Sequence, residues 1–372
     1  MKPLTRRSDI TILSLLLGLS LPMEAHAICP PEAGAFTIYV SPAGSDSNSG
    51  LTSLDPLHSL AAANALLDTS DPPQAVHVRI DPNNGPFMQT DAVLWTYFNS
   101  SHDTVLLPYD TTICSLTSAR WSGSRPVFTY SGNASKNWFN FKPTENVPSG
   151  SVPTNLYLLG LEVRGFRQNG IAFNPPAGRT FTNNVFANLS FFDIGNAGHP
   201  NLPWGYGAIQ LDRSSNNVIK YSRFQRIEND EGIGLDGKSH LHSIHAIYLH
   251  IGSDNNLIFE NKMIRVSGDP IKARDGSDYN NTHHNTFDRT GHLGFFQDYF
   301  AAGECAGFRN RLEFNDTDGD NDGLVREGWT ESGNGPQISY TNPKSPLPTG
   351  CPTDPPRFIV ANNDVVGAGS SW

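Results

Sequence analysis

Three stretches of the sequence decide the fold: NNVFANLSFFDI (183–194), NNVIKYSRFQRI (216–227) and NNLIFENKMIRV (255–266). Apolar residues occupy the same columns in all three, and a fourth Asn-Asn pair lies at 280–281. Asn suits such turns because it tolerates left-handed backbone and can stack in ladders. A block that recurs in this way predicts a solenoid built from stacked coils.

A second short strand follows each block: AIQLD (208–212), AIYLH (246–250), PIKAR (270–274) and GFFQD (294–298). Ile247, Ile271 and Phe295 are 24 residues apart, which is one coil of the solenoid. The longer spacing from Ile209 to Ile247 predicts extra loops of about 10 and 15 residues at one corner of two successive coils.

We therefore predict an all-β chain, a right-handed parallel β-helix with a short N-terminal capping helix. The strand and polar turn at 38–50, followed by the Ala/Leu-rich stretch 57–67, resemble the N-terminal cap of secreted right-handed parallel β-helix proteins. The expected domain is 28–372, with a cap at 36–70, regular coils over about 150–300 and an irregular C-terminal region at 301–372. A β-sandwich with Asn-rich turns is the alternative.

The N-terminal sequence indicates export. Basic residues precede a short apolar run at 10–21, and Ala25-His26-Ala27 has the pattern of a cleavage site, so residues 1–27 are predicted to be a signal peptide of a secreted or periplasmic protein. No other apolar run is long enough to cross a membrane. The four cysteines, Cys29, Cys114, Cys305 and Cys351, predict two disulfides whose pairing stays open.

Composition narrows the class of partner. The chain has 372 residues, 37% of them hydrophobic, which is too apolar for a disordered protein. Its net charge of −10, without a basic run, disfavours binding to nucleic acid or to anionic membranes.

Alternation along the second strands places polar side chains outside the solenoid. One expected outward column holds Gln210, Tyr248, Lys272 and Phe296, and the next holds Asp212, His250, Arg274 and Asp298. Coils lie ~4.8 Å apart, so neighbours in a column are within side-chain reach. The two inserted loops bring His199, Trp204, Tyr206, Asp230, Glu231, Asp236, Lys238, His240, His242 and His245 beside this face.

This face suits cleavage of an extended polysaccharide. Removal of a proton beside a uronate carboxylate needs a base, a cation and an acid, and His250, Arg274, Lys272 and Tyr248 are the predicted catalytic residues. Asp212, His245, Trp204, Tyr206 and Asp298 are the predicted substrate-binding residues. No pair among Asp212, Asp269 and Asp298 has the spacing that glycoside hydrolysis needs.

The stretch 245–287, with IYLHIGS and IKARDGSDYNN, resembles the core coils of β-helix alginate lyases and chondroitinase B. The resemblance implies β-elimination, with Arg274-Asp275-Gly276 at the family's Arg and His250 where the family has a base Lys. The family's calcium-binding Asn and Glu set has no clear counterpart. A glycoside hydrolase using Asp230, Glu231 or Asp236, and a non-catalytic glycan-binding surface protein, are the alternatives.

Alternate carboxylates near the C-terminus predict a structural calcium site, because calcium prefers oxygen ligands. A solvated acidic turn is the alternative, because the segment does not satisfy the full EF-hand pattern whether the loop is taken to begin at Asp316 or at Asp318. The predicted ligands are Asp316, Asp318, Asp320, Asp322 and Glu327.

Overall fold

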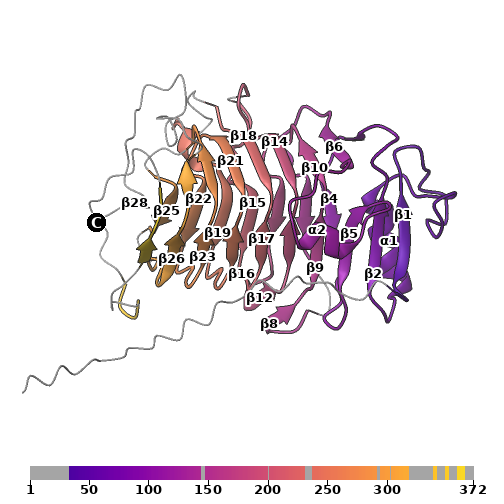
Figure 1. Cartoon of the computed structure of the whole chain (residues 1–372), viewed down its shortest axis with the longest axis horizontal. Coiled ribbons are helices and arrows are strands. Elements are labelled where there is room, and N and C mark those ends of the chain that lie inside the picture. The colour runs from indigo at the N-terminus through magenta and orange to yellow at the C-terminus, as the bar shows by residue number, and fades with distance from the viewer. Residues whose placement is uncertain are drawn as a thin grey trace, which may run out of the picture.

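The computed structural model describes residues 33–143, 147–199, 201–230, 237–290, 294–301, 303–317, 338–341, 348–351 and 358–364. The predicted signal peptide lies outside them. Three long sheets run side by side along the molecule, and every strand pairing in them is parallel (Figure 1). This excludes an antiparallel β-sandwich and fits the predicted parallel β-helix. The right-handed winding stays a prediction.

From β2 to β28, each coil contributes a strand to each long sheet in turn, while β1 and β29 extend sheet A alone. Sheet A contains β1 (Phe36–Val40), β2 (Val76–Ile80), β5 (Thr104–Pro108), β9 (Leu156–Leu159), β13 (Val185–Ala187), β17 (Val218–Lys220), β20 (Leu257–Phe259), β23 (Asn281–His283), β26 (Asn310–Glu313) and β29 (Phe358–Ala361). Sheet B contains β3 (Phe87–Gln89), β6 (Val127–Tyr130), β10 (Glu162–Arg164), β14 (Ser190–Ile194), β18 (Arg223–Ile227), β21 (Lys262–Val266), β24 (Thr286–Asp288) and β27 (Asp316–Thr317).

Sheet C, which carries the predicted site, contains β4 (Val93–Trp95), β7 (Phe139–Phe141), β11 (Ile171–Phe173), β15 (Gly207–Asp212), β19 (His245–His250), β22 (Ile271–Arg274), β25 (Phe296–Tyr299) and β28 (Ile338–Thr341). A small sheet D contains β8 (Gly150–Pro153), β12 (Arg179–Thr182) and β16 (Ser214–Ser215).

The predicted coil alignment is confirmed across the middle of the chain. Ile194 pairs with Ile227 in sheet B, and Ile209 pairs with Ile247 in sheet C. The connections from β14 to β15 and from β18 to β19 are long, whereas β21 and β22 are four residues apart. Both inserted loops therefore leave the solenoid at the corner between sheets B and C.

Two asparagine ladders fix the turns between coils. Side-chain amides donate from Asn184 to Asn217, from Asn217 to Asn256, and onward through Asn280 to Asn310, at 2.7–3.1 Å. A second ladder joins Asn261, Asn285, Asn315 and Asn363 at 2.9–3.0 Å. The residues just before Asn184, Asn217, Asn256 and Asn280 all have positive φ. In three of these four places the preceding residue is itself an asparagine, which tolerates the left-handed backbone. This explains why the asparagines occur in pairs.

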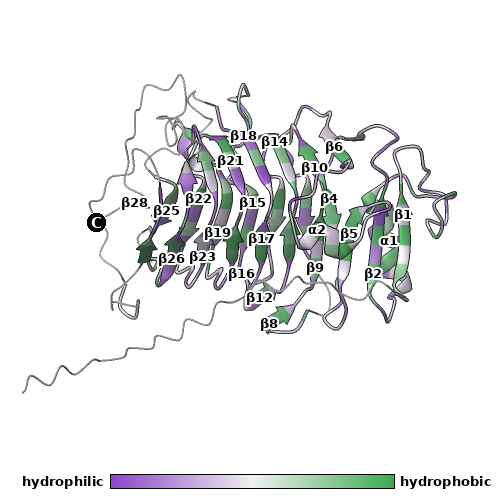
Figure 2. Ribbon diagram, in the orientation of Figure 1, coloured by the Kyte–Doolittle hydropathy of each residue, from purple (hydrophilic) through white to green (hydrophobic). Residues whose placement is uncertain are grey.

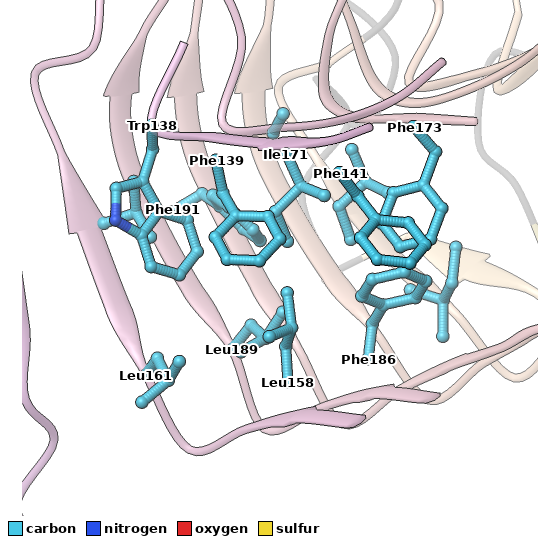
Figure 3. Close-up of a cluster of buried hydrophobic side chains, with 14 of the residues drawn as sticks. Trp138, Phe139, Phe141, Leu158, Leu161, Ile171, Phe173, Phe186, Leu189 and Phe191 are labelled. Carbon is cyan, nitrogen blue, oxygen red and sulfur yellow. The ribbon is translucent and has the colours of Figure 1, made fainter. Parts of the chain in front are cut away.

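Apolar side chains from all three long sheets fill the interior. Figure 3 shows part of this core, with Phe141 beside Phe173. The ring centroid of Phe141 is 4.6 Å from that of Phe173 and 5.2 Å from that of Phe181. Hydropathy changes from residue to residue along the strands, as expected when alternate side chains point inward and outward (Figure 2).

Helix α1 (Leu60–Ser70) occupies the predicted position and lies beside β1 at the N-terminal end of the stack (Figure 1). Ser59 caps it by accepting from the Ala62 amide. Its Leu60, Ala63 and Leu67 join the same core cluster as Ile38. Its capping role stays a prediction. Helix α2 (Ile113–Thr117) and the short 3₁₀ helix η1 (Leu241–Ser243) lie in connections.

The predicted register is wrong at the last described coils. Phe296, not Phe295, pairs with Ile271, so Gln297 follows Lys272 and Tyr299 follows Arg274. The connection into β25 is one residue longer than the 24-residue period allows. Two adjacent phenylalanines hide this shift in the sequence, because Phe295 and Phe296 are both fully buried.

Disulfides are present, as the cysteine count predicts. Cys305 is bonded to Cys351, Cys114 is also disulfide-bonded, and none of the described cysteines is free. Among the described residues, no helix is long and apolar enough to cross a membrane.

Candidate functional site

The candidate site lies on the outward face of β15, β19, β22 and β25 in sheet C. Ile247, Leu249, Ile271 and Ala273 point into the core cluster, so the residues between them face outward. Gln210, Tyr248, Lys272 and Gln297 form one outward column, because each pairs with the next across neighbouring strands. Asp212 pairs with His250, and Arg274 with Tyr299, in the second column.

Asp212 and His250 form the contact that their neighbouring positions predict. The Nδ1 atom of His250 lies 3.2 Å from Oδ1 of Asp212. An ionised carboxylate can only accept, so His250 carries its proton on Nδ1 and leaves Nε2 available. The two side chains remain 20% and 13% exposed, which leaves this pair accessible from solvent.

A chain of amides holds Asp212 in this orientation. Gln210 donates from Nε2 to Oδ1 of Asp212 over 3.1 Å, and Asn169 donates to Oε1 of Gln210 over 3.0 Å. The other end of the Asn169 side chain accepts from the backbone amides of Tyr206 and Gly207. Each amide therefore has one allowed orientation, and the sequence gives no sign of Asn169, which comes from a turn two coils away from His250.

Tyr248 is packed between aromatic rings. Its ring stacks on His250 at 5.2 Å and on Tyr206 at 5.9 Å between centroids. The side chain is only 2% exposed, and this burial raises its pKa above the ordinary value, although contact with Arg274 opposes the shift. Tyr248 therefore stays neutral and supports its neighbours.

Lys272 lies over two aromatic faces. Its Nζ atom is 4.6 Å from the ring centroid of Tyr299 and 5.4 Å from that of Tyr248. Burial, together with the positive charge of Arg274, lowers the pKa of Lys272 to about 8. A lysine in this range can exchange a proton near neutral pH.

Arg274 is bound by a residue that the sequence analysis missed. Glu304 accepts from Nε and Nη2 of Arg274 at 2.9 and 2.6 Å. Burial raises the pKa of Glu304, but the hydrogen bonds from Arg274 and the Ala301 amide outweigh it, and the net pKa lies below the usual value. Glu304 belongs to no repeat or motif, so only its place beside Cys305 in the C-terminal region could have drawn attention to it.

One predicted substrate-binding residue is fully buried, and another points into the solenoid. His245 is fully buried, with Nδ1 2.5 Å from the Asp269 carbonyl oxygen and its ring centroid 5.7 Å from that of Tyr248. Asp298 pairs with Ala273 and is fully buried, where it accepts from the Gly307 amide. The one-residue shift at β25 moves Asp298 inside and puts Tyr299 in its predicted place.

The inserted loops supply aromatic walls, as expected. Trp204 stacks on His240 with ring centroids 3.4 Å apart, which joins the first loop to the second. Tyr206 is 37% exposed beside Tyr248. Glu231 and Asp236 lie outside the described residues, and Asp230 accepts from the Gly198 amide.

The predicted calcium ligands are not brought together by what is described. Asp316 lies in β27 with its side chain exposed, while Asp318, Asp320, Asp322 and Glu327 lie outside the described residues. Within the described residues, no group of three or more His, Cys, Asp or Glu side chains could hold a metal ion.

No protein-family model and no curated protein sequence matches the chain. Among solved structures, it is similar to an alginate lyase from a Paenibacillus species (TM-score 0.43, 11% identity, 88% of this chain and 99% of that one). It is also similar to a rhamnogalacturonan lyase (0.38, 17%, 88% and 87%) and to a GH136 lacto-N-biosidase from Eubacterium ramulus (0.37, 12%, 88% and 67%). Similarity at this level does not distinguish a lyase from a hydrolase.

Proposed function

We propose that this protein is a secreted enzyme that cleaves a uronate-containing polysaccharide by β-elimination on the outer face of sheet C. The observation that carries the proposal is the oriented Asp212–His250 pair beside two cations, Lys272 and Arg274, on adjacent coils. A base, a proton donor and a positive field are what this reaction needs. The disulfide between Cys305 and Cys351 fits an oxidising compartment.

In the proposed step, Nε2 of His250 takes the proton from the carbon next to the uronate carboxylate. The electrons of that bond form a double bond to the neighbouring carbon, whose bond to the glycosidic oxygen breaks. Lys272 donates a proton to the departing oxygen, and solvent then returns the proton from His250 to Lys272. Arg274 stabilises the charge that builds on the carboxylate, while Tyr248 and Glu304 hold His250 and Arg274 in position.

Glycoside hydrolysis is less well supported by the same side chains. It needs one carboxyl group that is protonated near neutral pH. The lowered pKa of Glu304 opposes that role. Asp212 accepts hydrogen bonds from both His250 and Gln210, so its carboxylate is already engaged in holding His250. Asp230, Glu231 and Asp236 stay the alternative acids, of which Glu231 and Asp236 lie outside the described residues.

A screen of the purified chain on uronate polymers and on neutral glycans tests the proposal. We expect new reducing ends on at least one uronate polymer, accompanied by the ultraviolet absorbance of unsaturated uronate ends. Reducing ends without that absorbance would indicate a hydrolase. Binding without any new ends would indicate a glycan-binding protein.

A further inference from the structure

A polar pocket lies at the corner between sheets B and C, upstream of the candidate site along the solenoid. Its volume is about 280 Å³, and its lining comes from three successive connections of the chain. The lining residues are Asn133, Arg167, Gly198, His199, Asn201 and Leu202. Guanidinium, amide and imidazole groups thus converge on a space that is open to solvent.

Arg167 is the charged group of this pocket, and it has no ion-pair partner among the described residues. Arg164, Arg226 and Arg311 are each paired with a carboxylate, whereas Arg125, Arg179 and Arg213 donate to backbone carbonyl oxygens. Arg167 instead lies over the ring of Tyr130, with Cζ 5.9 Å from the centroid. In a chain of net charge −10, an arginine left without a carboxylate is available to an anionic ligand.

Hydrogen bonds hold the walls of the pocket. The Tyr130 hydroxyl donates to the Ala134 carbonyl at 2.8 Å and accepts from the Ala134 amide, so the ring under Arg167 is fixed. Asn196 donates to the Leu202 carbonyl at 2.9 Å and accepts from the Asp230 amide. Asp230 in turn accepts from the Gly198 amide at 2.8 Å, so this nearby carboxylate is engaged with backbone. A pocket built in advance loses little entropy on binding.

A chain of hydrogen bonds links the turn that carries Arg167 to the candidate site. Arg167 is two residues before Asn169, whose side chain begins the hydrogen-bonded chain through Gln210 and Asp212 to His250. The strand that follows Arg167, β11, is two strands from β19 in sheet C. Because coils are ~4.8 Å apart, the two positions are separated by about 10 Å along the axis. They are also offset across the sheet, since Phe173 is level with Leu249 and Arg167 lies before the start of β11.

We propose that the Arg167 pocket is a second anion-recognising subsite, which holds the carboxylate of another acidic sugar residue of the same polysaccharide chain. The identity of that chain as a cleaved substrate rests on the proposed function, whereas anion recognition rests on the pocket alone. The polymer would then cross sheet C obliquely, with one acidic residue at Arg167, before the start of β11, and another at His250 and Arg274, at the ends of β19 and β22.

Binding measurements separate these two claims. Oligosaccharides prepared from alginate, polygalacturonate and chondroitin, and the same oligosaccharides after reduction of their carboxylates, would be titrated into wild type, Arg167→Met and Arg223→Met. Arg223 contacts Gln225 on β18 and lies outside the pocket, so its variant removes an equal charge as a control. We expect Arg167→Met to weaken binding of a long acidic oligosaccharide about tenfold, as the loss of one charge-assisted contact would.

The carboxyl-reduced oligosaccharides should bind weakly to all three proteins and show no difference between them. Equal affinity of Arg167→Met and wild type for the acidic series would overturn the subsite, even if cleavage is observed. No binding of any acidic oligosaccharide to wild type would also overturn it. Weakened binding in Arg167→Met without any unsaturated product would keep the subsite and refute the proposed elimination.

Discussion

Two lysines packed against aromatic rings on neighbouring coils show what separates the candidate site from the rest of the solenoid. Lys220 in sheet A and Lys272 in sheet C both point outward, and burial lowers the pKa of each. Each Nζ lies over two aromatic rings, at 5.6 and 5.7 Å for Lys220 and at 4.6 and 5.4 Å for Lys272. Packing alone therefore does not identify a catalytic lysine.

Their surroundings differ. Lys220 is 1% exposed. The connection that carries α2 contacts the residues around it: the Tyr221 hydroxyl donates to the Ser118 carbonyl, and Arg120 donates to the Glu260 carbonyl. Lys272 lies beside Arg274 and one coil from His250. The side chains of His250 and Asp212 there remain partly exposed to solvent. Access to solvent and a neighbouring charged column, rather than burial, distinguish the site.

The largest expected difference comes from replacing each lysine. Lys272→Met should lower the elimination rate by at least ~10²-fold, because it removes the proposed proton donor. Lys220→Met should stay within roughly twofold of wild type, since no catalytic role is assigned to it. Both variants should remain folded, because methionine keeps the apolar stem and removes a buried charge. Equal loss of activity in both variants would contradict the comparison.

Asp212→Asn should lower the rate by about 10- to 100-fold, a range typical of residues that orient a catalytic group. Asparagine has the same shape as aspartate but can present an amide N–H to Nδ1 of His250. This weakens the preference for the tautomer of His250 that carries its proton on Nδ1. Asp193→Asn is the matched control, because Asp193 pairs with Arg226 on sheet B, away from the site. Initial rates of all three proteins would be compared, and an unaffected Asp212→Asn variant would remove the orienting role.

The pH dependence of the rate follows from Lys272. A proton donor with a pKa of about 8 is protonated below that value and loses its proton above it. The rate at saturating substrate should therefore fall about tenfold for each pH unit above ~8. Lys272→Arg, which stays charged, should lack this fall. An alkaline limb that is the same in both proteins would assign it to another group.

The smallest effect is expected from removing calcium, because the predicted calcium-binding segment lies far from both lysines in the sequence. If the acidic segment that begins at Asp316 binds the ion, chelation should lower the melting temperature by a few degrees, and added calcium should restore it. A melting curve that is the same with and without chelator would remove the predicted site.

The repeat made much of the fold predictable. The paired asparagines and the apolar columns placed β14, β18 and β21 in register and located both inserted loops, because one face of each strand must be buried. The shift at β25 was not predictable, since Phe295 and Phe296 fill the interior equally well in either register.

The site was predictable only where it follows strand alternation. His250, Asp212, Lys272 and Arg274 lie on the expected face because alternation fixes their direction. Glu304 and Asn169 come from irregular connections, where the direction of a side chain depends on tertiary contacts rather than on period. The sequence-based prediction placed Asp298 on the outward face because it did not include the one-residue shift at β25.

Elimination by His250 is tested most directly by counting unsaturated ends against new reducing ends in wild type and His250→Gln. We expect one unsaturated end for each new reducing end in wild type, and a loss of at least ~10²-fold in the variant with polymer binding retained. Reducing ends formed without unsaturation, or near-normal turnover by His250→Gln, would contradict it.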